Sequence, residues 1–267
     1  MPRRARPDRE VASRGVLLAL AAATGLAGLL VGSFLNVVIH RLPRGESLVT
    51  PRSRCPSCGA PVRSRDNVPV LSWLALHGRC HSCGAPISRR YPLVEALTAA
   101  LYVAVVLVEG ADRDVWLGLA LVTVLIPVAF IDLDHRIIPN RIVGPGAVLG
   151  IALVVALRPD DVVEHLVAGA IAGGFFLLAA LAYPRGMGMG DVKLAALLGL
   201  YLGRAVGPAL LVALLTGSIV GIAIIVRRGA REGRKTAVPF GPFLALGGIV
   251  GLLAGDEVVD WYLDTFV

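Results

Sequence analysis

Two acidic motifs and a set of four cysteines contain the residues of this chain that are best suited to chemistry. The motif FIDLDHRIIPN carries Asp132 and Asp134 at the polar end of an apolar run, and GMGMGDVKL carries Asp191 just before another. A carboxylate that faces lipid costs about 2–3 kcal/mol or more, so such residues usually face the interior of a helix bundle or a water-filled cavity. The aspartates are therefore candidates for function.

Asp132 and Asp191 are the expected catalytic pair. Two carboxylates that meet in a partly dry pocket cannot both ionise easily, so one keeps a proton while the other stays charged. An aspartyl protease uses this arrangement to activate water. Asp132 lies between two apolar residues, Ile131 and Leu133, whereas we interpret Asp134 as a solvated residue at the membrane interface.

The glycines that precede Asp191 suggest a place for a peptide substrate. Gly186, Gly188 and Gly190 alternate with methionines before a helical run. Because glycine allows close approach of another backbone, we expect Gly188 and Gly190 to bind the substrate. Asp191 can also serve as an ordinary helix N-cap, although capping alone does not need three glycines. Lys193 faces a different side of the helix, and we assign it no catalytic role.

The four cysteines form two CxxC pairs, CPSC at 55–58 and CHSC at 80–83, with 21 residues between them. This spacing favours a tetrahedral zinc site made by Cys55, Cys58, Cys80 and Cys83. The alternatives are two disulfides or four unrelated thiols. Each pair is followed by Gly-Ala-Pro, which predicts the same turn twice, and we interpret His81 as a bystander. Four sulfur ligands close a site, so the metal is expected to fold the segment and not to take part in catalysis.

The composition excludes an ordinary soluble domain, because 56% of the 267 residues are hydrophobic, 17% are charged and the mean hydropathy is +0.75. Apolar runs long enough to cross a bilayer, the sixth of them short, occur at about 16–39, 92–109, 115–133, 142–157, 163–183, 192–203, 207–226 and 238–255. We predict an all-α polytopic membrane protein with about eight transmembrane helices. The expected domains are a tail and first helix (1–39), a zinc-ribbon-like cytoplasmic insert (40–91) and a membrane-embedded domain (92–267).

The loop charges set the expected orientation. If the insert is cytoplasmic, that side also receives the basic residues of 136–141, 185 and 227–235, and the acidic stretches 109–114, 160–164 and 256–264 lie opposite. The arginine-rich N-terminal tail then lies on the outside, against the rule. The first apolar run has no cleavage site after it and is expected to remain as a helix. The net charge of +7 follows from the loop bias, so no nucleic-acid partner is expected.

Taken together, these motifs resemble one family along nearly the whole chain. GMGMGDVKL resembles the GxGD signature of intramembrane aspartyl proteases, and IDLDHRIIPN resembles the partner motif of the type IV prepilin leader peptidases. The segments SFLNVVIHRLP, DNVPVLSW and RYPLVE and the paired CxxC insert also resemble that family, in the same order. Where many relatives have IPD, this chain has Asn140, a departure outside the expected pair.

The resemblance implies a bifunctional enzyme of the bacterial inner membrane that works near the cytoplasmic face. It implies removal of the leader from prepilins or pseudopilins of pilus, type II secretion or competence systems, followed by N-methylation with S-adenosylmethionine. On this resemblance Asp132 and Asp191 match the catalytic pair. No glycine fingerprint for a methyl donor is present. One alternative is an ion-coupled transporter with a regulatory zinc ribbon, although transporters usually place their carboxylates near the membrane midplane within inverted repeats. The other is a membrane scaffold with inert aspartates.

Overall fold

The computed structural model describes residues 7–183, 187–229 and 238–266, and it is helical throughout except in the insert. Seven helical stretches within these residues are long and apolar enough to cross a membrane. The fold class predicted from the sequence is thus confirmed. The count is seven because the sixth and seventh expected runs form one stretch, Met189–Arg228, which a short 3₁₀ turn interrupts.

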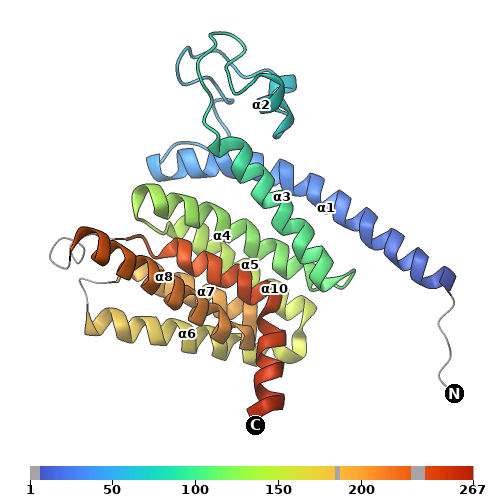
Figure 1. The fold of residues 1–267 in the computed structure, drawn as a ribbon, viewed down its shortest axis with the longest axis vertical. Coiled ribbons are helices and arrows are strands. Elements are labelled where there is room, and N and C mark those ends of the chain that lie inside the picture. Colours follow the sequence, from blue (N-terminus) through green and yellow to red (C-terminus); the bar gives the residue numbers. More distant parts are fainter. Residues whose placement is uncertain (1–6, 184–186, 230–237, 267) are drawn as a thin grey trace. The chain divides into compact units, whose positions relative to one another are not determined.

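The chain divides into two compact units, Met1–Val115 and Trp116–Val267. In the first unit, α1 (Pro7–Arg41) and α3 (Arg90–Glu109) pack side by side (Figure 1). Small residues allow this contact, since a Cβ on Gly28 would lie 2.7 Å from the Cα of Ala99, and one on Gly32 would lie 2.7 Å from the Cα of Glu95. Close helix packing of this kind supplies the association energy that the hydrophobic effect cannot supply in lipid.

The insert between these helices contains η1 (Leu42–Arg44), η2 (Ser64–Asn67) and the short helix α2 (Leu71–Ala75). Residues of α1 and α3 hold it. The buried Glu95 accepts a hydrogen bond from the backbone amide of Val70 at 2.7 Å, and the guanidinium of Arg41 donates to the carbonyl oxygens of Ser47 and Pro51. Several residues of the motifs SFLNVVIHRLP, DNVPVLSW and RYPLVE thus fix the insert to its two helices.

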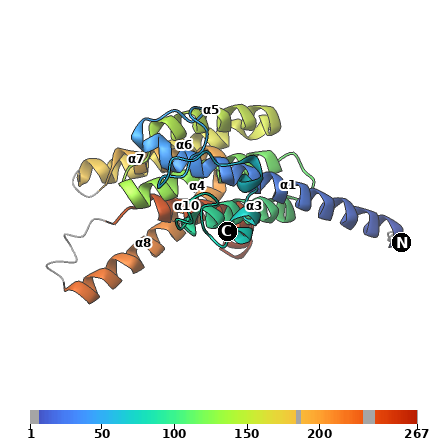
Figure 2. The ribbon, with the colours of Figure 1, turned by 90° about the horizontal axis from the view of Figure 1, so that it is seen from above.

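The second unit consists of α4 (Val115–His135), α5 (Asn140–Leu157), η3 (Pro159–Asp161), α6 (Val162–Ala182), α7 (Met189–Leu202), η4 (Gly203–Ala205), α8 (Val206–Arg228) and α10 (Gly241–Phe266). Helix α7 lies at its centre, and Leu194, Leu197 and Leu198 are almost completely buried. Figure 2 shows α6 and α7 together, and a Cβ on Gly199 would lie 2.5 Å from the carbonyl oxygen of Ala168.

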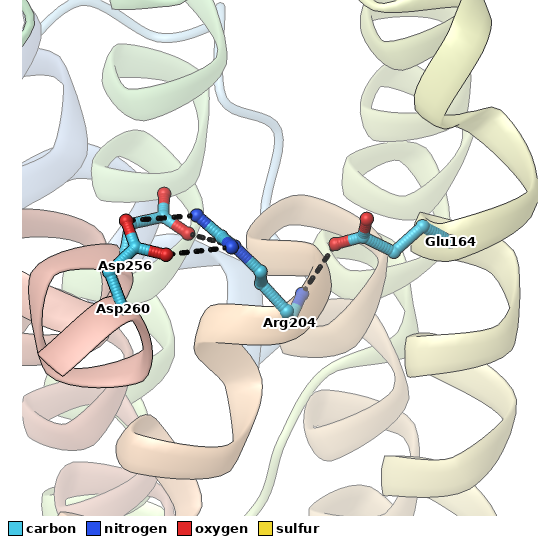
Figure 3. Close-up of polar contacts among 4 residues, drawn as sticks. All are labelled: Glu164, Arg204, Asp256 and Asp260. Carbon is cyan, nitrogen blue, oxygen red and sulfur yellow. Dashed lines mark hydrogen bonds and ion pairs between the residues drawn. The ribbon is translucent and has the colours of Figure 1, made fainter. Parts of the chain in front are cut away.

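A charged cluster lies where α7 ends (Figure 3). The guanidinium of Arg204 is 3.0 Å from Asp256 Oδ1 and 2.9 Å from Asp260 Oδ1, and its backbone amide donates to Glu164 Oε1 at 3.0 Å. These contacts connect the start of α6, the turn η4 and the late part of α10. The apolar run of α10 was expected to end at 255, but the helix continues to Phe266 through these aspartates.

Candidate active site

Asp132 is placed by the last turn of α4. The helix ends because Arg136 adopts a left-handed conformation, with φ of 54°, while its amide still donates to the carbonyl oxygen of Asp132 at 2.9 Å. The side chain of Asp132 is 5% exposed, and its Oδ2 accepts a hydrogen bond from the backbone amide of Gly241 at 2.8 Å. Asp134, in contrast, is exposed, as the sequence predicted. The buried carboxylate of this motif is therefore Asp132.

Asp191 is placed by the first turn of α7. The structure makes Gly188 the N-cap of this helix, and Asp191 lies three residues later, where its Oδ2 accepts a hydrogen bond from the Gly188 amide at 3.2 Å. This is the returning half of a capping box. The alternative interpretation of Asp191 as an ordinary N-cap is therefore wrong, because Gly188 occupies the N-cap position and Asp191 lies three residues inside the helix.

The two aspartates lie at the same end of the second unit, Asp132 in the last turn of α4 and Asp191 in the first turn of α7. The negative charge of Asp132 acts on the carboxylate of Asp191. In each residue one oxygen accepts a hydrogen bond from a glycine amide. Within the described residues no salt bridge reaches either side chain. A pair of neighbouring carboxylates without a cation is the arrangement in which one proton is shared.

The predicted glycines have different surroundings. A Cβ on Gly190 would lie 2.8 Å from the Cβ of Ile138, so this glycine lets the segment after Asp132 pack against the start of α7. The position of Gly188 is more open, since a Cβ there would lie 3.4 Å from Asp191 Oδ2 and 3.9 Å from the Gly190 nitrogen. Substrate binding by these two residues remains a prediction, and Gly186 lies outside the described residues.

Lys193 has a neighbour that the sequence did not suggest. Its Nζ donates to Asn140 Oδ1 at 2.9 Å, and this contact joins the first residue of α5 to the first turn of α7. Both side chains are exposed. The bond connects the two acidic motifs through residues that carry neither carboxylate of the pair.

Gly241 is the residue near the pair that the sequence did not reveal. It begins α10, 109 positions after Asp132. The only signal was the segment PFGPF, in which a proline beside a glycine is typical of a helix start. Nothing in such a segment indicates that its amide binds a distant carboxylate.

A second candidate site lies in the insert of the first unit. The sulfur atoms of Cys55, Cys58, Cys80 and Cys83 all lie within 4.8 Å of one another, and the Sγ atoms of Cys55 and Cys83 are 3.9 Å apart. Ligands at about 2.3 Å in a tetrahedron around zinc are about 3.8 Å apart, so the four sulfurs fit the metal. A disulfide needs sulfurs at about 2.05 Å, and the four cysteines are free.

The two CxxC segments have the same local structure. The amide of Cys55 donates to the Ala60 carbonyl at 2.9 Å, and that of Cys80 donates to the Ala85 carbonyl at 2.8 Å. The following glycines, Gly59 and Gly84, have φ of 70° and 71°. The predicted repetition of one turn is confirmed.

The thiols of the cluster influence one another. The amides of Cys58 and Ser57 lower the pKa of the Cys55 thiol to about 6. The Ala85 amide acts to lower the pKa of the Cys83 thiol, but the neighbouring cysteine thiols and burial outweigh this effect and raise that pKa to about 11. His81 is outside the cluster of four, and its Nε2 lies 3.1 Å from Arg63 Nη1. The interpretation of His81 as a bystander agrees with this placement.

Comparison with known proteins gives one consistent answer. Residues 26–108 match the bacterial peptidase A24 N-terminal domain, and residues 119–226 match the type IV leader peptidase family. A protein of Aeromonas hydrophila named prepilin leader peptidase/N-methyltransferase is 39% identical, with 91% of this chain and 93% of its own length aligned. A Pseudomonas aeruginosa protein of the same name is 38% identical over 92% and 94% of the two chains. A Myxococcus xanthus protein, also of that name, is 45% identical over 78% and 64%.

No solved structure matches this chain. The family is nevertheless shown, because these relatives are more than 30% identical and align along most of their length. The matched family regions include Asp132, Asp191 and the four cysteines. The chain therefore belongs to the type IV leader peptidase family, with a peptidase A24 N-terminal domain before the leader peptidase region.

Proposed function

We propose that the protein is a membrane-embedded aspartyl endopeptidase that removes the leader peptide from type IV prepilins or pseudopilins, with Asp132 and Asp191 as its catalytic pair. The observation that supports the proposal is that these two carboxylates lie at the same end of the helix bundle, close enough for the charge of Asp132 to act on Asp191, and that no salt bridge among the described residues reaches either of them. The names of the relatives supply the substrate class. An ion-coupled transporter receives no such support.

The chemistry needs no covalent intermediate. The ionised carboxylate takes a proton from water, and the resulting hydroxide attacks the scissile carbonyl carbon, while the protonated carboxylate donates a hydrogen bond to the carbonyl oxygen. When the intermediate breaks down, the C–N bond is cleaved and the leaving amine takes up a proton from the protonated carboxylate. One product ends in a carboxylate and the other begins with a free amine. The more open Gly188 and its neighbour Gly190 are proposed to bind the substrate backbone beside the pair.

The proposed location is the cytoplasmic side of the bacterial inner membrane. Asp132, Asp191 and the start of α10 lie at the same end of the second unit as Arg136 and Arg141, whereas the acidic residues around Arg204 lie at the other end. The positive-inside rule assigns the basic end to the cytoplasm. A substrate with a basic leader would keep that leader in the cytoplasm while its apolar segment enters the bilayer.

The proposal also includes a second activity and a metal site. The names of the relatives include an N-methyltransferase, so the new amino terminus is proposed to be methylated with S-adenosylmethionine, to which we assign no described residue. The four cysteines are proposed to hold structural zinc, which would fold the insert as a closed site. The three-part division into 1–39, 40–91 and 92–267 stays a prediction.

The peptidase is tested by cleavage of a synthetic prepilin with a basic leader in membranes that contain the protein. Asp132→Asn and Asp191→Asn should each lower cleavage by about 10³-fold, because each removes a proton-transfer group. Asp134→Asn is the matched control and should cleave at nearly the wild-type rate. Normal cleavage by either pair variant, at equal protein levels, would reject the catalytic assignment.

The metal is tested by measuring zinc in the purified protein and by the variants Cys58→Ser and Cys83→Ser. We expect one zinc per chain in the wild type, less in either variant, and proteolysis that begins within residues 40–91 once zinc is lost. A wild-type protein that lacks zinc and yet resists proteolysis there would contradict the proposal.

A further inference from the structure

We propose that Gly241 is a positioning residue for Asp132: its backbone amide holds one carboxylate oxygen, so that the other oxygen is presented to the reaction. The inference rests on the proposed peptidase function. The amide nitrogen of Gly241 is 2.8 Å from Asp132 Oδ2, and the contact is buried. Among the described residues this is the hydrogen bond that fixes the Asp132 side chain, and none is recorded to Oδ1.

The amide is available because Gly241 is the first residue of α10. The first four amides of a helix have no partner within the helix and are satisfied by other groups. The positive end of the helix dipole also favours a negative group at this place. Both effects favour the ionised carboxylate of Asp132, and both act on Oδ2.

Only glycine leaves room for this bond. A Cβ at position 241 would lie 2.7 Å from Asp132 Oδ2 and 3.1 Å from its Cβ and Cγ. Gly241 is not among the residues with positive φ, so space, and not backbone conformation, requires the glycine. Any larger residue must push the Asp132 carboxylate away from its present position.

The start of α10 is itself fixed by the preceding residue. The ring of Phe240 lies 6.0 Å from that of Phe176 in α6 and 6.0 Å from that of Phe243. A Cβ on Gly217 of α8 would lie 2.8 Å from the Phe240 ring, so this ring fills the space beside α8. The aromatic contacts therefore determine where the Gly241 amide points, and through it where Asp132 lies.

The test compares three variants in the same cleavage assay. Gly241→Ala keeps the amide but displaces the carboxylate, and Gly241→Pro also removes the N–H donor, which the first helical position tolerates. Gly255→Ala is the matched control, because Gly255 lies 14 positions farther along α10 and its Cβ would lie 2.7 Å from the Cβ of Ala205 in η4. The measurements are kcat, KM, the pH profile of kcat/KM and Tm.

We expect kcat to fall about 10²-fold in Gly241→Ala, since displacement of a reacting group by about 1 Å has effects of that size. The kcat of Gly241→Pro should fall further than that of Gly241→Ala. Because its lost hydrogen bond stabilised a charged group, the acidic limb of its pH profile should move to higher pH by about one unit. Gly255→Ala should lower Tm and leave kcat and the pH profile of the folded enzyme unchanged.

A further variant keeps the test decisive if substitutions at 241 reduce folding. Phe240→Leu leaves the glycine intact and loosens only its anchor, so it should lower kcat several-fold and shift the acidic limb in the same direction. Wild-type kcat and pH profile in folded Gly241→Pro, or a change of Tm alone in Phe240→Leu, would overturn the inference. Absence of cleavage by the wild type would instead reject the proposed function.

Discussion

The carboxylates at the two ends of the second unit differ in burial and in their partners. At one end Asp132 is 5% exposed and its recorded hydrogen bond comes from the Gly241 amide. At the other end the side chains of Asp256 and Asp260 are each 55% exposed and both pair with Arg204. A carboxylate paired with arginine keeps its charge, whereas one held by an amide in a dry place can exchange a proton. The difference supports the proposed chemistry at the first end and a stabilising role for the ion pairs at the second.

The largest expected effect comes from placing the same substitution at both ends. Asp191→Asn should reduce cleavage by about 10³-fold, because it removes a group that transfers a proton. The double variant Asp256→Asn/Asp260→Asn should cleave within about twofold of the wild type, because exposed ion pairs contribute at most about 1 kcal/mol each and lie far from the reaction. Cleavage per mole of folded enzyme measures both. A large loss in the double variant would remove the distinction between the ends.

A second comparison concerns the packing around the pair. Gly190→Ala should lower kcat about tenfold to a hundredfold, because the new Cβ would lie 2.8 Å from Ile138 and would displace the segment that follows Asp132. Gly174→Ala in α6 meets no atom within 4 Å and serves as the control. A rise in KM at unchanged kcat would instead support substrate binding as the main role of Gly190.

A smaller effect is expected at the other end, and it should be confined to stability. Gly203 has φ of 53°, and a Cβ there would lie 2.9 Å from Glu164 Oε1. Gly203→Ala should therefore lower the free energy of unfolding by about 1–3 kcal/mol. Thermal unfolding and cleavage per folded enzyme should be measured together. If kcat falls at unchanged Tm, the two ends are coupled, contrary to our assignment.

The sequence predicted the parts of this architecture that depend on local patterns. Apolar runs of membrane length became helices, and the repeated Cys-Gly-Ala-Pro segments became the same turn, because both are determined within a few residues. Asp132 was distinguished from Asp134 by its apolar neighbours alone. The apolar settings of Asp132 and Asp191 suggested a catalytic pair, and the family resemblance then matched both residues to it.

The sequence did not predict what depends on distant contacts. The Gly241 amide reaches a carboxylate 109 positions away, and no local pattern records such a bond. The length of α10 was underestimated for a similar reason. Asp256 and Asp260 indicated the end of the apolar run, but the helix continues through them to Phe266, and Arg204 of a different segment pairs with both.

The smallest expected effect on stability and cleavage comes from Asn140→Asp. This change tests the comparison of the two ends, because it adds a carboxylate paired with a cation to the end that carries Asp132 and Asp191. Lys193 Nζ lies 2.9 Å from Asn140 Oδ1, so Asn140→Asp converts a hydrogen bond into an ion pair. Both side chains are exposed, and the gain in stability should be about 0.2–1 kcal/mol and smaller at high salt. A double-mutant cycle with Lys193→Gln, measured by thermal unfolding, isolates the free energy of this ion pair.

Cleavage by Asn140→Asp should stay within about twofold of the wild-type rate, because the positive charge of Lys193 neutralises the added negative charge near the pair. If Asn140→Asp changes the pH profile only when Lys193 is also replaced, the lysine shields the pair from a neighbouring charge. A change with Lys193 present would show that a paired carboxylate still perturbs catalysis, and the contrast between the two ends would then rest on distance and not on pairing.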